Sequence, residues 1–215
     1  LSARMTLEIN RLKCATLYPL NIELPFMSYE ILRSILLNKR NKLKQSVQTK
    51  PFMGVIKRSF RAGLMDIDFN MHINNARYMV FMERARWDHP VQTTSWDVML
   101  KEKLNFIVAG IEMSYIREIR LGTRFEVESR YLGWDEKYVY LEQRFIVKGK
   151  IHAYGMVKGV FLQYGKVAEP SHIARILGVI TTPELLPEHM KLWKRIGEAK
   201  RAFSSSSVLE EMQGG

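Results

Sequence analysis

The chain has 215 residues, 47% of them hydrophobic and 26% charged, which is enough to bury one core of ordinary size. No apolar run reaches the roughly 18 residues that a membrane-spanning helix needs. Because Cys14 is the only cysteine, an intrachain disulfide and a cysteine-based zinc site are excluded. We therefore expect one soluble domain with extensions.

The formal charge of +11 is concentrated near the start of the chain. Residues 1–50 hold nine Lys and Arg against three Asp and Glu, a net +6. Such a basic arm suggests attraction to phosphate in nucleic acid, anionic lipid or a nucleotide-bearing substrate, although a solvated cationic tail explains it equally well. The basic character and the start at Leu1 fit a mitochondrial location, and the alternatives are cytoplasmic or membrane-peripheral ones.

Residues 1–51 are predicted to form a basic extension with one amphipathic helix. Between Phe26 and Gln45, four apolar residues recur at helical spacing among basic residues. They are Tyr29, Leu32, Leu36 and Leu43. Such a helix either packs on its own domain or lies on a membrane surface or a partner.

The compact domain is predicted to span residues 52–165. It begins with a strand at residues 55–61, which ends at Ala62-Gly63. The segment 76–87 has apolar residues around most of a helical circumference, so we expect a buried helix there.

Four further strands are expected at residues 106–115, 124–132, 138–147 and 151–162. The hairpin turns at residues 133–137 and 148–150 predict an antiparallel meander. Small residues on one face of the last strand, Ala153, Gly155 and Gly159, would let the buried helix approach closely. The fold class is therefore α+β: an antiparallel sheet of about five strands wrapped around a long central helix, with residues 166–215 forming a helical extension and a flexible tail.

The segment between the first strand and the helix gathers polar side chains. Asp68, Asn70 and His72 alternate, so they share one side if the backbone is extended. Asn74 and Asn75 are suited to starting a helix, whose N-terminal amides favour a developing oxyanion.

The same residues also have structural interpretations. Asp68 is equally suited to capping a turn or the helix, and His72 to a hydrogen bond with the backbone. We expect Glu83, on the helix, to form a salt bridge with Arg77 or Arg86.

Other catalytic and cofactor motifs are absent from the sequence. The remaining histidines lack metal-ligand spacing, and no Walker, Rossmann or Gly-x-Ser-x-Gly sequence is present. We therefore expect neither a metal nor a cofactor.

The element order and the polar segment resemble those of the hotdog-fold acyl thioesterases over roughly residues 52–163. The run Asp68-x-Asn70-x-His72-Ile73-Asn74-Asn75-x-x-Tyr78 is similar to the motif of plant acyl-ACP thioesterases. The shorter run from His72 to Tyr78, followed by Glu83-Arg84-Ala85-Arg86, also resembles bacterial 4-hydroxybenzoyl-CoA-thioesterase-like proteins and the animal thioesterase superfamily member 6 group.

The resemblance implies hydrolysis of an acyl-CoA or acyl-ACP thioester. Asp68 would be the nucleophile or the base that activates water, with Asn70 and His72 completing the polar set. The helix start at Asn74 and Asn75 would hold the oxyanion, and Tyr78 would contact the substrate. The acyl-ACP enzymes carry two hotdog repeats, whereas this chain has one, so the family implies a homodimer joined through the sheets.

A second hypothesis belongs to a different class. A hotdog domain with an idle site and long extensions would serve as a structural subunit of a mitochondrial ribosome or another RNA-rich assembly. Its basic N-terminal extension would then contact ribosomal RNA and proteins.

Overall fold

The computed structural model describes residue 29 and residues 32–37, 39–40, 50–93, 95–179 and 186–205. Most of the predicted basic extension and the tail beyond residue 205 therefore lie outside the described residues.

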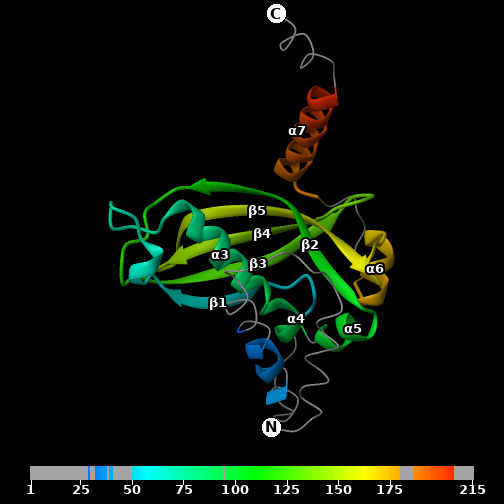
Figure 1. The fold of residues 1–215 in the computed structure, drawn as a ribbon, viewed down its shortest axis with the longest axis horizontal. Coiled ribbons are helices and arrows are strands. Elements are labelled where there is room, and N and C mark those ends of the chain that lie inside the picture. Colours follow the sequence, from blue (N-terminus) through cyan, green and yellow to red (C-terminus); the bar gives the residue numbers. More distant parts are fainter. Residues whose placement is uncertain are drawn as a thin grey trace, which may run out of the picture.

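Six strands form one antiparallel sheet in the order β1-β3-β4-β5-β2, with β6 added beside β5 (Figure 1). The hairpins β3-β4 and β4-β5 confirm the predicted meander. The strands are β1 (Ile56–Arg61), β2 (Leu104–Tyr115), β3 (Arg124–Trp134), β4 (Val139–Val147), β5 (Lys150–Gln163) and β6 (Lys166–Val167).

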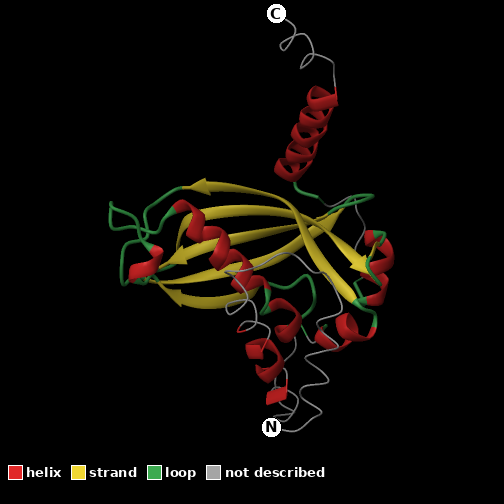
Figure 2. Ribbon diagram, viewed as in Figure 1, coloured by secondary structure: helices red, strands yellow, loops and turns green. Residues whose placement is uncertain are grey.

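The long helix α3 (Asn75–Arg86) lies in the curve of the sheet, and shorter helices gather near its C-terminal end (Figures 1 and 2). The α+β architecture with a sheet wrapped around one central helix is therefore as predicted. The remaining helices are the 3-10 helix η1 (Leu64–Asp66), α4 (His89–Gln92), α5 (Trp96–Lys101), α6 (Pro170–Ile176) and α7 (Glu188–Ser205).

The main core lies between α3 and the inner face of the sheet. Helix α3 contributes Tyr78, Phe81, Met82 and Ala85, which pack on inward-facing aromatic and branched side chains of β3, β4 and β5. The helix is not buried all round as expected, because Met79 and other residues on its outer side are exposed. One face of α3 thus packs on the sheet, and the opposite face is open.

Gly155 on β5 is a point of close approach between α3 and the sheet. A Cβ added there would overlap the side chains of Met82 on α3 and Met113 on β2. The predicted role of a small residue facing the helix is confirmed at Gly155. At Gly159 the crowding comes instead from Phe106 on the neighbouring strand β2, so that glycine makes room for a strand.

The outer face of the sheet carries a separate apolar cluster. Tyr140 of β4 and Met156 of β5 pack there against Leu186 and Met190, at the start of α7. The two faces of the sheet therefore hold different helices, with α3 on the inner face and α7 on the outer one.

The described part of the N-terminal helix contacts the domain through polar residues. Arg33 forms an ion pair with the nearly buried Asp88, and the Ser34 hydroxyl donates to the carbonyl oxygen of Trp87. Leu32 and Leu36 are exposed. These residues of the predicted apolar stripe therefore do not face the domain, and the helix contacts the domain through Arg33 and Ser34 instead.

His89 is buried in α4 beside the rings of Phe52 and Tyr131. Its Nε2 donates to the carbonyl oxygen of Phe52 at 2.8 Å. Burial lowers the pKa of His89 from 6.5 to about 4, although this hydrogen bond acts in the opposite direction. The folded protein therefore holds a neutral imidazole in a site that disfavours the charged form.

This histidine predicts a loss of stability in mild acid. Between pH 6.5 and about pH 4 the unfolded chain binds the His89 proton more readily than the folded protein. The contribution of neutral His89 to the free energy of unfolding is complete above pH 6.5. It decreases as the pH falls and is smaller by about 2 kcal/mol at pH 5. Urea unfolding of the wild type and of His89→Gln at pH 7 and pH 5 tests this. An equal pH dependence in both proteins would contradict it.

Candidate active site at the start of the central helix

The connection between β1 and α3 is held in place by Asp66. One carboxylate oxygen, Oδ1, accepts from Arg77 Nε at 3.0 Å and Nη2 at 2.7 Å, and the other accepts from the Gly63 amide at 2.9 Å. The backbone carbonyl of Asp66 also accepts from the Asn74 amide. Because Arg77 belongs to α3, this carboxylate ties the loop directly to the helix.

The candidate base, Asp68, lies in a tight turn within this loop. Its Oδ1 accepts from the Asn70 amide at 2.9 Å, and its carbonyl oxygen accepts from the Met71 amide at 3.0 Å. Met71 adopts a φ of 61°, in the left-handed region. The run from residue 68 to 72 is therefore not extended as predicted, since the Asp68 side chain competes for backbone donors and closes a turn.

The turn brings Asp68 and His72 together. His72 Nδ1 lies 3.5 Å from Asp68 Oδ1, and their side chains are 30% and 25% exposed. The Asp68 amide donates to the His72 carbonyl at 3.0 Å, which fixes the backbone of the pair. Asp68 Oδ2 has no hydrogen-bond donor in the part of the chain that the structure describes. One carboxylate oxygen is thus engaged by the turn, and the side chain as a whole is one quarter exposed to solvent.

The remaining predicted polar residues have distinct positions. Asn70 is exposed, and it is its backbone amide that donates to Asp68. Asn74 is the N-cap of α3, and its side chain accepts from the Ala76 amide at 2.9 Å. Asn75 is the first residue of the helix and is exposed.

The Asn75 amide differs from its neighbours at the start of α3. The amides of Ala76 and Arg77 donate to the side chain and the carbonyl of Asn74. Among the described residues, the Asn75 amide has no acceptor. It is therefore the N–H in this turn that is open to an incoming oxyanion.

Tyr78 is buried in the core under this turn. Its ring packs edge-on against Phe145 and Tyr115, with centroids 4.9 and 5.1 Å away. Burial raises the pKa of Tyr78 to about 12, so the hydroxyl is neutral at physiological pH. Tyr115, at the end of β2, donates from its hydroxyl to the Asn75 carbonyl at 3.3 Å.

The connection between β2 and β3 closes the other side of the loop. The Ile73 amide donates to the Ile119 carbonyl at 2.8 Å, and the Leu121 amide donates to the Met71 carbonyl at 3.1 Å. His72 is thereby held between Asp68 and this connection, opposite Arg120.

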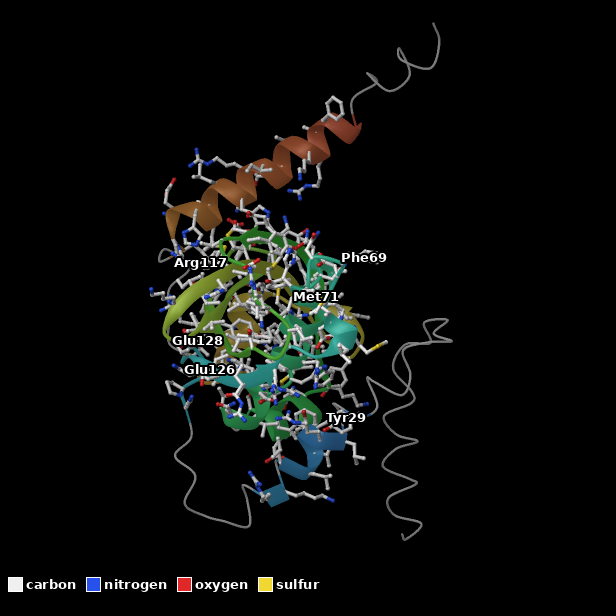
Figure 3. All side chains as sticks on the ribbon, turned by 90° about the vertical axis from the view of Figure 1, so that its left-hand side faces the viewer. Tyr29, Phe69, Met71, Arg117, Glu126 and Glu128 are labelled. Atoms are coloured by element: carbon white, nitrogen blue, oxygen red, sulfur yellow. The ribbon has the colours of Figure 1, made fainter. Side chains whose placement is uncertain are left out.

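Exposed apolar side chains surround the site. Phe69 is fully exposed at the tip of the turn, and Figure 3 shows it with Met71 at the surface of this end of the molecule. The other large apolar residues exposed here are Leu64, Met65, Tyr115 and Ile116. Several exposed apolar side chains beside polar residues are a feature of binding and association sites.

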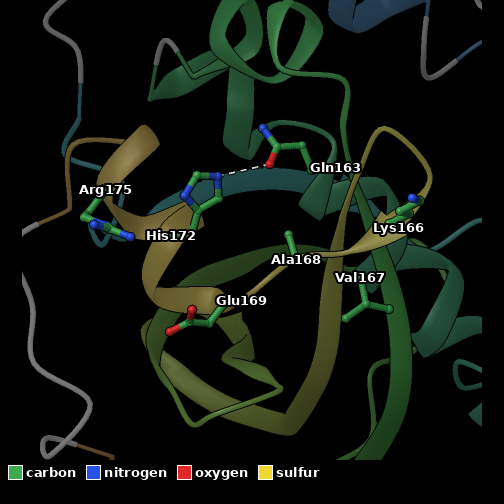
Figure 4. Close-up of a pocket in the computed structure, with 7 residues that line it drawn as sticks. All are labelled: Gln163, Lys166, Val167, Ala168, Glu169, His172 and Arg175. Carbon is green, nitrogen blue, oxygen red and sulfur yellow. Dashed lines mark hydrogen bonds between the residues drawn. The ribbon is translucent and has the colours of Figure 1, made fainter.

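A separate hollow of about 350 Å³ lies between the end of β5, β6 and α6. His172 Nε2 lies 3.1 Å from Gln163 Oε1 in its wall, and Arg175 and Lys166 line it (Figure 4). Figure 1 shows α6 and the β1-α3 loop at opposite ends of the sheet. The hollow is therefore not part of the site at Asp68.

Two residues of the site were missed in the sequence, Asp66 and its partner Arg77. Arg77 pairs with Asp66, and Arg86 donates to the Gln143 side chain at 2.9 Å, so the expected salt bridge of either arginine with Glu83 is wrong. An acidic residue ahead of an arginine in the first helical turn was an available signal, but their sequence separation of 11 hides the contact.

Within the described ranges, no group of three or more His, Cys, Asp or Glu residues is arranged to hold a metal ion. The same residues include no helix that is both long and apolar enough to cross a membrane.

Solved structures share this fold with the chain, including two that are named as thioesterases. YbaW, a probable thioesterase from Escherichia coli, superposes with a TM-score of 0.53 at 24% identity, covering 57% of this chain and 96% of that one. The 12:0-ACP thioesterase from Umbellularia californica gives 0.51 at 15% identity, covering 63% and 54%. The curled sheet, its central helix and these likenesses define a hotdog fold.

Sequence comparison assigns the family. A model of the thioesterase-like superfamily matches residues 62–193. Protein THEM6 of Danio rerio is 31% identical over 156 residues, covering 70% of this chain and 75% of that protein. The long-chain acyl-CoA thioesterase FadM of Escherichia coli is 34% identical over 64 residues, 30% of this chain and 48% of that protein. The chain belongs to the thioesterase-like superfamily, as its motif indicated.

The Asp66–Arg77 contact predicts that the loop depends on one partly buried ion pair. Arg77→Ala removes two charge-assisted hydrogen bonds and is expected to lower the free energy of unfolding by about 1 to 2 kcal/mol. Arg120→Ala removes only the exposed pair with Glu118 and should cost less than about 0.5 kcal/mol. Urea unfolding measures both variants. Equal effects would show that Asp66 does not anchor the loop.

Proposed function

We propose that this protein hydrolyses the thioester bond of an acyl-CoA, with Asp68 as the residue that activates water. The observation that carries the proposal is the Asp68–His72 pair at the start of α3, in a chain of the thioesterase-like superfamily. An ionised carboxylate beside an imidazole can accept a proton from water.

The proposed reaction forms one carbon–oxygen bond, breaks one carbon–sulfur bond and moves one proton twice. Water bound at Asp68 Oδ2 loses a proton to the carboxylate as its oxygen attacks the thioester carbonyl carbon. The carbon–sulfur bond then breaks, and the proton passes to the departing thiolate, giving a free acid and a thiol. His72 orients the Asp68 carboxylate through the 3.5 Å contact with Oδ1.

The developing negative charge on the carbonyl oxygen would be held at the helix start. The Asn75 amide is the donor we assign to it, because the following two amides are already bonded to Asn74. The positive end of the α3 dipole adds to this stabilisation. Asn74 therefore acts by shaping the helix entry, and the backbone of Asn75 acts on the substrate.

The substrate class rests on relatives. FadM is a long-chain acyl-CoA thioesterase by name and matches 64 residues of this chain, which supports a fatty-acyl-CoA. An acyl-ACP is the other carrier consistent with the family. The named relatives reported above favour an enzyme over the structural-subunit hypothesis, and no observation supports contacts with a ribosome. The mitochondrial location stays a prediction.

Substitution of Asp68 tests the proposed function. Asp68→Asn keeps the acceptor for the Asn70 amide but removes the base, so kcat/KM for acyl-CoA hydrolysis should fall by about 10² to 10⁴. Thiol release from acyl-CoAs of several chain lengths measures the rate. Asp97→Asn, on the surface of α5, is the matched control and should keep wild-type activity.

Asp68→Asn with full activity would overturn the assignment of the base. Absence of wild-type hydrolysis on any acyl-CoA, together with turnover of acyl-ACP, would change the carrier and leave the mechanism intact.

We also propose that two copies associate through β2. Among the described residues this strand is an edge of the sheet, because it pairs there with β5 alone. Ile107 and Ala109 are exposed along it, whereas the opposite edge, β1, presents Lys57 and Ser59. An exposed apolar edge strand favours pairing with another strand, and an edge with charged side chains disfavours it.

Ile107→Lys with Ala109→Lys is expected to convert a dimer to a monomer, since charge on an edge strand opposes edge-to-edge pairing. Light scattering after size-exclusion chromatography gives the molar mass. Ser59→Lys on β1 is the control and should leave the mass unchanged. A dimer that persists in the β2 variant would exclude this interface.

A further inference from the structure

Helix α7 packs on the domain with one of its sides. Met190 is fully buried on the outer face of the sheet. Trp193 lies beside it, with its ring 4.8 Å from Lys158 Nζ and 6.4 Å from the Tyr140 ring. Lys194 pairs with Asp135 and Glu136. These contacts fix the rotation of α7 about its own axis.

The opposite side of α7 carries an exposed apolar stripe. Leu192 and Ile196 are 48% and 52% exposed, and the exposed residues Ala199 and Phe203 continue the same line. Their spacing of four, three and four residues keeps all four within about 60° of one another around the helix. Figures 1 and 3 show α7 extending away from the sheet.

Basic residues border the stripe. Over its 18 residues α7 holds five Lys and Arg against two Asp and Glu, a net charge of +3. Glu188, the acidic residue nearest the stripe, pairs with Arg195 and lies near Lys191. An apolar line flanked by cations on a helix of low overall hydrophobicity is the pattern of helices that lie in the headgroup region of a membrane.

We propose that α7 docks this protein on an anionic phospholipid surface. The stripe of Leu192 and Ile196 enters the boundary between headgroups and acyl chains, and the flanking lysines and arginines contact the headgroups. The whole chain carries +11, so the attraction extends beyond the helix itself.

Charge favours lipid over a second copy of the chain as the occupant. Two α7 helices brought together would each contribute +3, and like charges across an interface oppose association. Lysine is also depleted at the centre of protein interfaces, whereas Lys191 and Lys200 lie on either side of the narrow stripe. An anionic surface neutralises these charges.

The docking is independent of the proposed hydrolysis. α7 lies on the outer face of the sheet, whereas Asp68 lies in the loop leading to α3. Turnover of a soluble acyl-CoA can therefore persist when membrane binding is lost, so failure of one proposal is distinguishable from failure of the other.

Sedimentation of the full chain with vesicles tests this proposal. Binding is expected to vesicles of phosphatidylcholine with phosphatidylserine, to weaken for phosphatidylcholine alone, and to weaken with added salt. Leu192→Ser with Ile196→Ser should reduce binding at least about tenfold, because each side chain loses its apolar burial. Lys191→Glu with Lys200→Glu keeps the stripe and should abolish the preference for anionic vesicles.

The N-terminal helix provides the matched control. Leu32 and Leu36 are 45% and 57% exposed beside basic residues, so Leu32→Ser with Leu36→Ser makes the same chemical change elsewhere. This variant should bind vesicles as the wild type does. Thermal unfolding of each variant verifies that it is folded.

Three results would overturn the proposal. If the α7 double variant binds vesicles as the wild type does, the stripe is not the membrane contact. The same follows if only the N-terminal variant loses binding. A wild type that ignores vesicles and an α7 variant of lower molar mass would assign the stripe to a second copy of the chain.

Discussion

Burial of one face of α3 in the curve of the sheet is the interaction on which the rest of the structure depends. Tyr78, Phe81 and Met82 pack on the inner side of β3, β4 and β5, and Gly155 leaves room there for Met82. This contact sets the direction of the helix and therefore the place of its N-terminus. The Asp66–Arg77 ion pair then ties the preceding loop to the first turn. The geometry of the candidate site therefore depends on how the core packs.

Each face of the sheet is covered by a different element. The inner face is committed to α3, and its outer counterpart receives Leu186 and Met190 at the start of α7. Among the described residues, the exposed apolar groups include the β2 edge, the side chains around Phe69, Leu32 and Leu36 of the N-terminal helix, and the stripe of α7. Each of these surfaces exposes hydrophobic groups to water, which costs free energy. Contact with another molecule would remove that cost. The proposed dimer and the proposed membrane surface use different parts of this exposed set.

Strand alternation and helical periodicity were sufficient to predict the sheet, the central helix and the polar segment between them, because these patterns reflect burial directly. They were not sufficient for the local geometry at Asp68. Extended backbone was assumed there, whereas the Asp68 carboxylate accepts from the Asn70 amide and closes a turn. The Asp66–Arg77 pair and the polar docking of Arg33 on Asp88 were also missed. Pairs of this kind depend on which segments the fold brings together, and no short-range pattern in a sequence encodes that.

The turn at Asp68 reconciles the structural and the catalytic interpretations of that residue. As a turn-former, Asp68 uses Oδ1 to accept the Asn70 amide, and this same oxygen lies 3.5 Å from His72 Nδ1. The carboxylate is thereby oriented without the use of Oδ2, which keeps its lone pairs for water. The helix start is arranged in the same way. Asn74 accepts hydrogen bonds from the amides of Ala76 and Arg77, and the Asn75 amide is left open. Local hydrogen bonds that shape the loop therefore select which oxygen and which amide are available for chemistry.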